Sequence, residues 1–89
     1  MNEGSELIEF YGEECPHCRR MEKVVAQFEK RHKTKITKLE VWHNKENMKL
    51  LETIPAFASC RGVPFFWNKE IGKAICGECT LEQLEDWAS

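Results

Sequence analysis

Two cysteines separated by two residues are the part of this sequence best suited to chemistry. Cys15 and Cys18 lie in the stretch FYGEECPHCRR, directly after a short apolar run. Pairs with this spacing act as redox dithiols or supply two of the four ligands of a structural zinc ion. A second pair with the same spacing, Cys76 and Cys79 in AICGECT, keeps both interpretations open, and Cys60 is the fifth cysteine.

Length and composition restrict the function further. The chain has 89 residues, 42% of them hydrophobic, which predicts one globular domain over residues 1–89. The net charge of −2 argues against nucleic-acid partners, and no apolar stretch is long enough for a membrane span. The first residues, MNEGSELIEF, lack the basic and apolar parts of a signal sequence, so we expect a cytoplasmic location. We also expect a monomer. In the cytoplasm, several cysteines indicate redox catalysis or metal binding more than structural disulfides.

Hydrophobic periodicity and turn signals place these cysteines on predicted elements. Strands are expected at residues 7–11, 36–42, 63–67 and 73–76. One helix should run from about residue 15 to the basic stretch 31–35, a second should follow Asn44 and end near Pro55, and a third should follow the capping box of Thr80 and Gln83. The order βαβαββα implies a parallel strand pair and, at its end, an antiparallel hairpin.

The first helix is expected to give its two cysteines different surroundings. Cys15 lies at the helix start, before Pro16, where unpaired backbone N–H groups and the positive end of the helix dipole favour a thiolate. Cys18 is three residues before Met21 on the apolar face and should turn toward the core. An exposed Cys15 could then attack a disulfide, and a shielded Cys18 could resolve the mixed disulfide. His17 would support the Cys15 thiolate through a hydrogen bond or its charge.

The stretches EFYGEECPHC and GVPFFWN together resemble the thioredoxin superfamily, and the predicted order of elements is that of its core. CPHC is similar to the motif of DsbA-type oxidants, whereas the length is closer to a glutaredoxin. The resemblance implies an α/β, thioredoxin-like fold with a four-stranded mixed sheet flanked by helices. The chain departs from these relatives: it has no helical insertion like that of DsbA and no tryptophan next to Cys15 as in thioredoxins.

The same resemblance implies a function and roles for individual residues. The protein would be a thiol–disulfide oxidoreductase without a bound cofactor, with Cys15 as nucleophile and Cys18 as resolving thiol. Its partners would be protein or glutathione disulfides and an unidentified thiol reductase. Val63 and Pro64 match the family's cis-proline position, where the Val63 backbone would pair with a substrate strand. Glu9 matches a buried acid that exchanges protons with the shielded cysteine. From the residues alone, the alternative is that Glu9 faces solvent, paired with a lysine.

The second cysteine pair has no counterpart in the ordinary pattern of the family. We expect Cys76 and Cys79 near the proline loop as an auxiliary redox dithiol or disulfide, or as incidental thiols. The main alternative function is a small zinc-binding interaction module that uses all four paired cysteines, Cys15 and Cys18 included. A Cys76–Cys79 bond would close a short loop and stabilise the chain little. Cys60 is expected to be a small apolar core residue.

Overall fold

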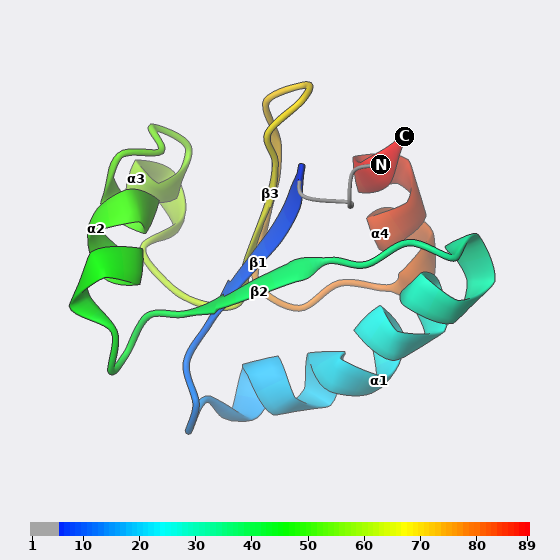
Figure 1. Cartoon of the computed structure of the whole chain (residues 1–89), viewed down its shortest axis with the longest axis horizontal. Helices are drawn as coiled ribbons and strands as arrows, with labels where there is room; N and C mark the ends of the chain where they lie inside the picture. The colour runs from blue at the N-terminus through cyan, green and yellow to red at the C-terminus, as the bar shows by residue number, and fades with distance from the viewer. Residues whose placement is uncertain (1–5) are drawn as a thin grey trace.

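Strands and helices alternate along the chain in the computed structural model, which describes residues 6–89 (Figure 1). In chain order the elements are β1 (Leu7–Tyr11), α1 (Pro16–His32), β2 (Thr37–Glu40), α2 (Lys45–Glu52), α3 (Phe57–Cys60), β3 (Phe65–Asn68), β4 (Lys73–Cys76) and α4 (Leu81–Ala88). The predicted order is therefore confirmed apart from α3, a short helix that the sequence did not predict.

The strands form one mixed sheet in the order β2-β1-β3-β4. β1 and β2 run parallel, with Ile8 opposite Thr37, and the pairs β1–β3 and β3–β4 are antiparallel. The long helix α1 connects the parallel pair, and a tight turn connects the antiparallel hairpin of β3 and β4. The fold class predicted from the sequence, a four-stranded mixed sheet flanked by helices, is confirmed.

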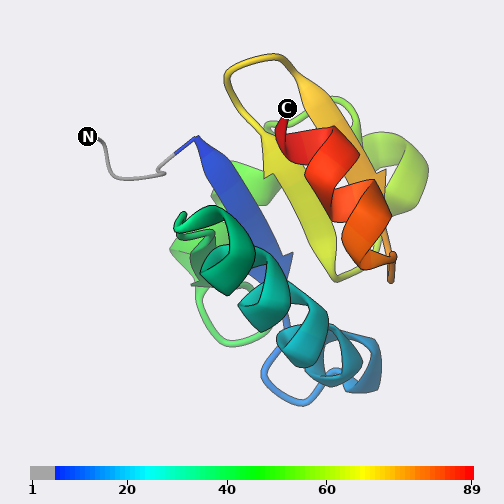
Figure 2. The ribbon, with the colours of Figure 1, turned by 90° about the vertical axis from the view of Figure 1, so that its right-hand side faces the viewer.

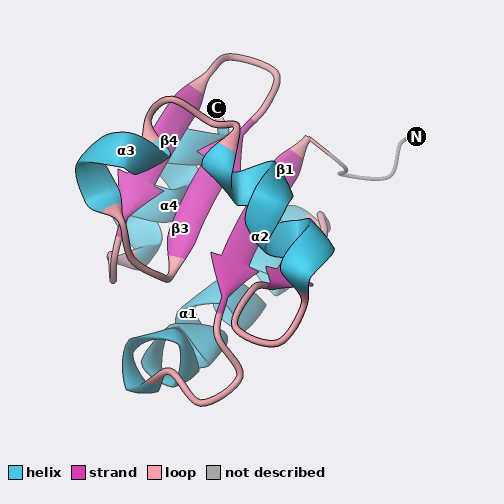
Figure 3. Cartoon of the chain, turned by 90° about the vertical axis from the view of Figure 1, so that its left-hand side faces the viewer, coloured by secondary structure: helices cyan, strands magenta, loops and turns pink. Residues whose placement is uncertain are grey.

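Helices cover both faces of this sheet, α1 and α4 on one side and α2 and α3 on the other (Figures 1, 2 and 3). Because successive side chains of a strand point to opposite faces, the strands contribute to two separate apolar clusters. The cluster on the α1 and α4 side contains Leu7, Met21, Val25, Phe28, Ile36, Phe66, Leu84 and Trp87. The cluster on the α2 and α3 side contains Ile8, Phe10, Val41, Leu51, Ile54 and Phe65.

The expected helix caps are present. The Asn44 side chain accepts the backbone N–H of Asn47 at 2.9 Å at the start of α2. At the start of α4, the Thr80 hydroxyl accepts the N–H of Gln83, and the Gln83 side chain accepts the N–H of Thr80. These reciprocal bonds satisfy N–H groups that lack partners within the helix and so fix where α4 begins. Of the helices in residues 6–89, none is long and apolar enough to cross a membrane.

Candidate active site

The chain enters α1 through Cys15, which is the N-cap residue of the helix. Its backbone is extended, and its sulfur accepts the N–H of Cys18 at 3.2 Å. Pro16 occupies the first turn, where its missing N–H costs no helical hydrogen bond. The Cys15 N–H donates to the carbonyl of Gly12 at 3.1 Å, which closes the turn between β1 and α1. The predicted helix start is thus confirmed, and it brings the two sulfur-bearing residues one helical turn apart.

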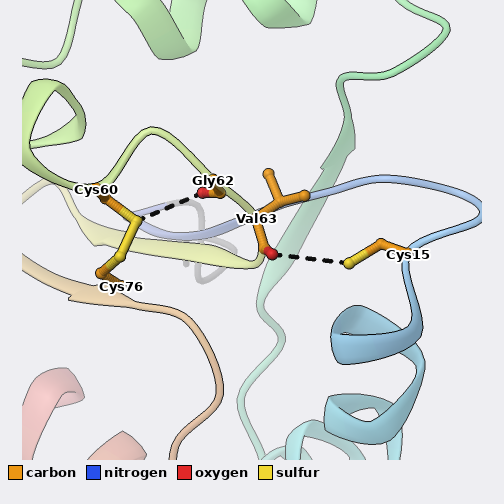
Figure 4. Close-up of a disulfide and its surroundings, with 5 residues drawn as sticks. All are labelled: Cys15, Cys60, Gly62, Val63 and Cys76. Atoms are coloured by element: carbon orange, nitrogen blue, oxygen red, sulfur yellow. Dashed lines mark hydrogen bonds between the residues drawn. A yellow bond between two sulfur atoms is a disulfide. The ribbon is translucent and has the colours of Figure 1, made fainter.

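The expectation that Cys15 is exposed is wrong. Cys15 is only 3% exposed and Cys18 only 4%. As an N-cap, Cys15 turns its sulfur back over the end of the helix, and its thiol also donates to the Val63 carbonyl oxygen at 3.7 Å (Figure 4). The sulfur is therefore enclosed between the helix end and the Val63 loop. Cys18 lies inside, as expected. Burial raises the pKa of its thiol most, and its hydrogen bond with Cys15 raises it further.

The Val63–Pro64 loop lies beside Cys15, as the resemblance implied. The peptide bond between Val63 and Pro64 is cis. The loop connects α3 with β3, and the Pro64 carbonyl accepts the N–H of Gly77 at 2.8 Å. One side of the loop therefore faces the nucleophile candidate, and the other is attached to the turn after β4.

Glu9 is buried on β1, with 5% of its surface exposed. Burial raises the pKa of its carboxyl from 4.5 to about 7. The neighbouring Lys38 forms its 2.7 Å ion pair with Glu29, so the expected alternative of a solvated Glu9 paired with a lysine does not hold. Glu9 and Cys18 both line one cleft of about 470 Å³. The acid and the inner thiol thus share a space through which a proton could pass.

A bond between Cys76 and Cys79, one of the possibilities that the sequence left open, does not form. Cys76 is bonded to Cys60, with 5.6 Å between the two Cα atoms (Figure 4). Cys60 is consequently half of a disulfide and not an isolated apolar residue. Cys79 is a free, half-buried thiol, and burial raises its pKa to about 11.

The alternation of β4 explains this pairing. Ala74 and Cys60 pack against the cluster on the α2 and α3 side, whereas Ile75 and Cys79 pack against the cluster on the α1 and α4 side. Cys76 follows Ile75 and so points to the face of Ala74 and Cys60. Cys76 and Cys79 therefore diverge to opposite faces of the sheet, in spite of their close spacing in the sequence.

The same disulfide argues against the zinc site of the alternative function. A zinc ion is bound by thiolates, and the sulfur of Cys76 is already bonded to Cys60. Within residues 6–89, the side chains close enough to share a metal ion are instead Glu13, Glu40 and His43. The Glu40 carboxylate already accepts hydrogen bonds from three backbone N–H groups.

Residues at and just after the end of β2 hold the loop before Cys15, and sequence reasoning did not identify them. The Glu40 carboxylate accepts the N–H groups of Glu13, Trp42 and His43 at 2.9, 3.2 and 2.8 Å. The Trp42 ring lies so close to Gly12 that any side chain there would overlap it. Trp42 is nevertheless half exposed, at 50%. It places an aromatic surface against the active-site loop of a chain that has no tryptophan next to Cys15.

His17 lies one residue before Cys18, but its hydrogen-bonding partners differ from the expected one. Its Nδ1 lies 2.6 Å from a carboxylate oxygen of Glu78 and 2.9 Å from Nη2 of Arg20. The structure gives no hydrogen bond between His17 and the Cys15 sulfur within the described residues. Glu78 belongs to the second CxxC motif, so its contact links the two motifs.

Comparisons with known proteins agree with this geometry. The Thioredoxin family model matches residues 1–89, and the chain belongs to that family. It shares its fold with the crystal structure of a glutaredoxin from Archaeoglobus fulgidus, with a TM-score of 0.64 and 21% sequence identity over 93% of this chain and 85% of that one. A search of curated proteins found no match. The family and the Cys15–Cys18 pair together support thiol oxidoreductase chemistry in general.

Proposed function

We propose that the protein is a thiol–disulfide oxidoreductase in which Cys15 attacks a substrate disulfide and Cys18 resolves the mixed disulfide. One observation carries the proposal: the Cys15 sulfur lies at the start of α1, 3.2 Å from the Cys18 nitrogen and 3.7 Å from the Val63 carbonyl oxygen. The Cys15 sulfur faces the N–H groups that have no helical partner at the start of α1, and it accepts one of them, that of Cys18. Because burial raises the pKa of Cys18, its thiol stays protonated until it resolves the mixed disulfide.

The two steps exchange sulfur bonds and protons between substrate and protein. The Cys15 thiolate attacks one sulfur of the substrate disulfide, and the other leaves as a thiolate. Cys18 then transfers its proton to the Glu9 carboxylate, and its thiolate displaces the substrate sulfur from Cys15. The protein gains a Cys15–Cys18 disulfide, and the substrate is reduced by two electrons. A thiol reductase restores the dithiol, and the same steps in reverse would oxidise a dithiol substrate.

Protein disulfides and glutathione disulfides are the proposed substrate classes. The backbone of Val63, next to Cys15 and only half buried, offers peptide groups that an extended substrate segment could pair with. Because Cys15 itself is buried, a substrate has to approach along this loop. The cytoplasmic location, the monomeric state and the recycling reductase remain predictions.

A trapping experiment tests the division of roles. Cys18→Ser should accumulate a mixed disulfide at Cys15 when it is incubated with disulfide-bonded insulin or with oxidised glutathione, because the resolving sulfur is absent. Cys15→Ser should form no such adduct and should lose all measurable disulfide reductase activity. Mass spectrometry of the acid-quenched, alkylated protein would identify the residue that carries the adduct.

Cys79→Ser is the matched control, since it also removes a free, shielded thiol but lies outside α1. It should neither trap substrate nor lose more than about twofold in activity. An adduct on Cys18 in Cys15→Ser, or equal trapping by Cys79→Ser and Cys18→Ser, would overturn the assignment.

A further inference from the structure

The carboxylate of Glu78 is bound to two basic residues of the first turns of α1. Arg20 donates to it from Nε at 3.2 and 3.1 Å and from Nη2 at 2.8 Å. His17 Nδ1 lies 2.6 Å from the oxygen that also accepts from Arg20 Nη2. All three side chains are accessible to solvent. Glu78 thus connects the second CxxC motif to the helix that carries the first.

The backbone around Glu78 is held in place from both sides. Cys76, two residues before it, is bonded to Cys60. Gly77 has a φ of 88°, a left-handed conformation that favours glycine, and its N–H is bound by the Pro64 carbonyl. The N–H of Cys79, the next residue, points to the Met21 sulfur at 3.4 Å. The turn that carries Glu78 is therefore held in place, and the Glu78 side chain extends from it to α1.

The charges of Glu78, Arg20 and His17 affect the stability of a thiolate at Cys15. The hydrogen bonds from Arg20, and then from His17, lower the pKa of Glu78 to about 2, so it is a carboxylate throughout the physiological range. The pKa of Arg20 is raised chiefly by its hydrogen bonds and charge interaction with Glu78, and to a smaller extent by the charge of a thiolate at Cys15. Glu78 offsets the positive charge of Arg20 and holds the His17 ring in its own hydrogen bond. Both effects reduce the positive charge available to a thiolate at Cys15.

We infer that Glu78 is a positioning residue that limits the oxidising power of the Cys15–Cys18 pair by keeping Arg20 and His17 engaged away from the Cys15 sulfur. This inference rests on the proposed function. A more stable thiolate favours the dithiol over the disulfide, so removal of the Glu78 charge should make the pair a stronger oxidant. The second CxxC motif would then contribute to redox chemistry through Glu78, which lies between its cysteines.

The chain contains a matched control for this cluster. Glu85 on α4 binds Arg31 at 3.5 Å and His32 at 2.9 Å, so it also joins an arginine and a histidine of α1 to a carboxylate. Those residues are at the other end of α1, about 20 Å from its start at 1.5 Å per residue. Glu85→Gln therefore removes the same kind of contact without changing the charge near Cys15.

The test equilibrates wild type, Glu78→Gln, Glu78→Asp and Glu85→Gln with glutathione. Two glutathione thiols reduce the Cys15–Cys18 disulfide to the dithiol and become oxidised glutathione, so the electrons balance. Mass spectrometry of the acid-quenched, alkylated peptide with Cys15 and Cys18 gives the fraction oxidised, separately from Cys60–Cys76. The alkylation rate of Cys15 as a function of pH gives an independent measure of how easily its thiolate forms.

Glu78→Gln should shift the equilibrium toward the dithiol by about threefold and should move the midpoint of Cys15 alkylation to lower pH, both small effects because the cluster is exposed. In Glu78→Asp both values should lie closer to those of the wild type, and in Glu85→Gln both should equal those of the wild type. No shift in Glu78→Gln, a shift in the opposite direction, or an equal shift in Glu85→Gln would overturn the inference. If wild type forms no reversible Cys15–Cys18 disulfide, the proposed function itself fails.

Discussion

The two CxxC motifs have the same spacing but different structures. In the first, Cys15 caps α1 and Cys18 lies one turn further on, so the N–H of Cys18 meets the Cys15 sulfur at 3.2 Å. In the second, Cys76 ends a strand and Cys79 follows a turn, and their side chains belong to opposite faces of the sheet. A helix brings residues at this spacing onto one face, whereas the end of a strand followed by a turn separates them.

The comparison shows that spacing alone does not define a redox pair. The first motif has a helix end, a buried acid and the Val63 loop around its sulfurs. The second contributes one cysteine to a bond with α3 and leaves the other against the apolar cluster of α1 and α4. We therefore propose that the chemistry takes place at Cys15 and Cys18, and that the Cys60–Cys76 bond has a stabilising role.

Loss of this disulfide should have the largest effect on stability. The bond joins residues 16 apart in the chain. Closing a loop of this size lowers the entropy of the unfolded state and so stabilises the folded state by about 3 kcal/mol. The double variant Cys60→Ser/Cys76→Ser should therefore lower the Tm by roughly 10–20 °C. Thermal unfolding followed by circular dichroism would measure the change. The earlier expectation of little stabilisation assumed the short Cys76–Cys79 loop.

Cys79→Ser is the control for the disulfide variant, because it leaves the bond intact and replaces a half-buried thiol in the same segment. Its Tm should fall by only a few degrees, since one sulfur loses its apolar contacts. Equal losses in the two variants would mean that apolar packing near the turn, and not the Cys60–Cys76 bond, is what stabilises this part of the chain.

Glu9→Gln should change the pH dependence of both stability and turnover. Because burial raises the pKa of Glu9 from 4.5 to about 7, the folded chain holds a proton over this range that the unfolded chain has released. The free energy of unfolding of the wild type should therefore fall by up to about 3 kcal/mol as the pH rises through that range. Glu9→Gln should lack this loss, and urea denaturation at several pH values would measure the difference between the two proteins.

The same substitution should slow the resolution of the mixed disulfide by about 10²-fold at neutral pH, because Cys18 loses its proton acceptor. Stopped-flow measurement of substrate release from Cys15 would detect this. Glu22→Gln is the matched control, since Glu22 lines the same cleft but is exposed. If Glu22→Gln slows release as much as Glu9→Gln, the charge of the cleft matters and not a proton transfer by Glu9.

Most of the fold could be predicted because its signals are local. Apolar periodicity identified the strands and α1, and the side chains of Asn44 and Thr80 marked the starts of α2 and α4. The helix start at Cys15 followed from Pro16 by the same reasoning. Each of these signals depends on neighbours within about one helical turn, which are visible in a sequence.

What could not be predicted depends on contacts between distant residues. The four-residue helix α3 has no side-chain cap at its start, so nothing local marks it. The Cys60–Cys76 bond requires α3 to lie against the end of β4, and the burial of Cys15 requires the Val63 loop to cover it. The contact of His17 with Glu78 spans 61 residues. Such pairings follow from the assembled sheet and not from spacing.

The smallest expected effect tests the comparison between the motifs most directly. Cys60→Ser leaves Cys76 without its partner, and Cys79 is the free thiol nearest to it in the sequence. Because the two side chains point to opposite faces of the sheet, and burial raises the pKa of Cys79 to about 11, we expect no bond between them under mild oxidation. Differential alkylation and mass spectrometry should find both as free thiols, while the Cys15–Cys18 disulfide forms normally in the same sample. A Cys76–Cys79 bond in this variant would show that the turn at Gly77 rearranges easily, and the second motif would then have to be regarded as a redox pair that Cys60 keeps blocked.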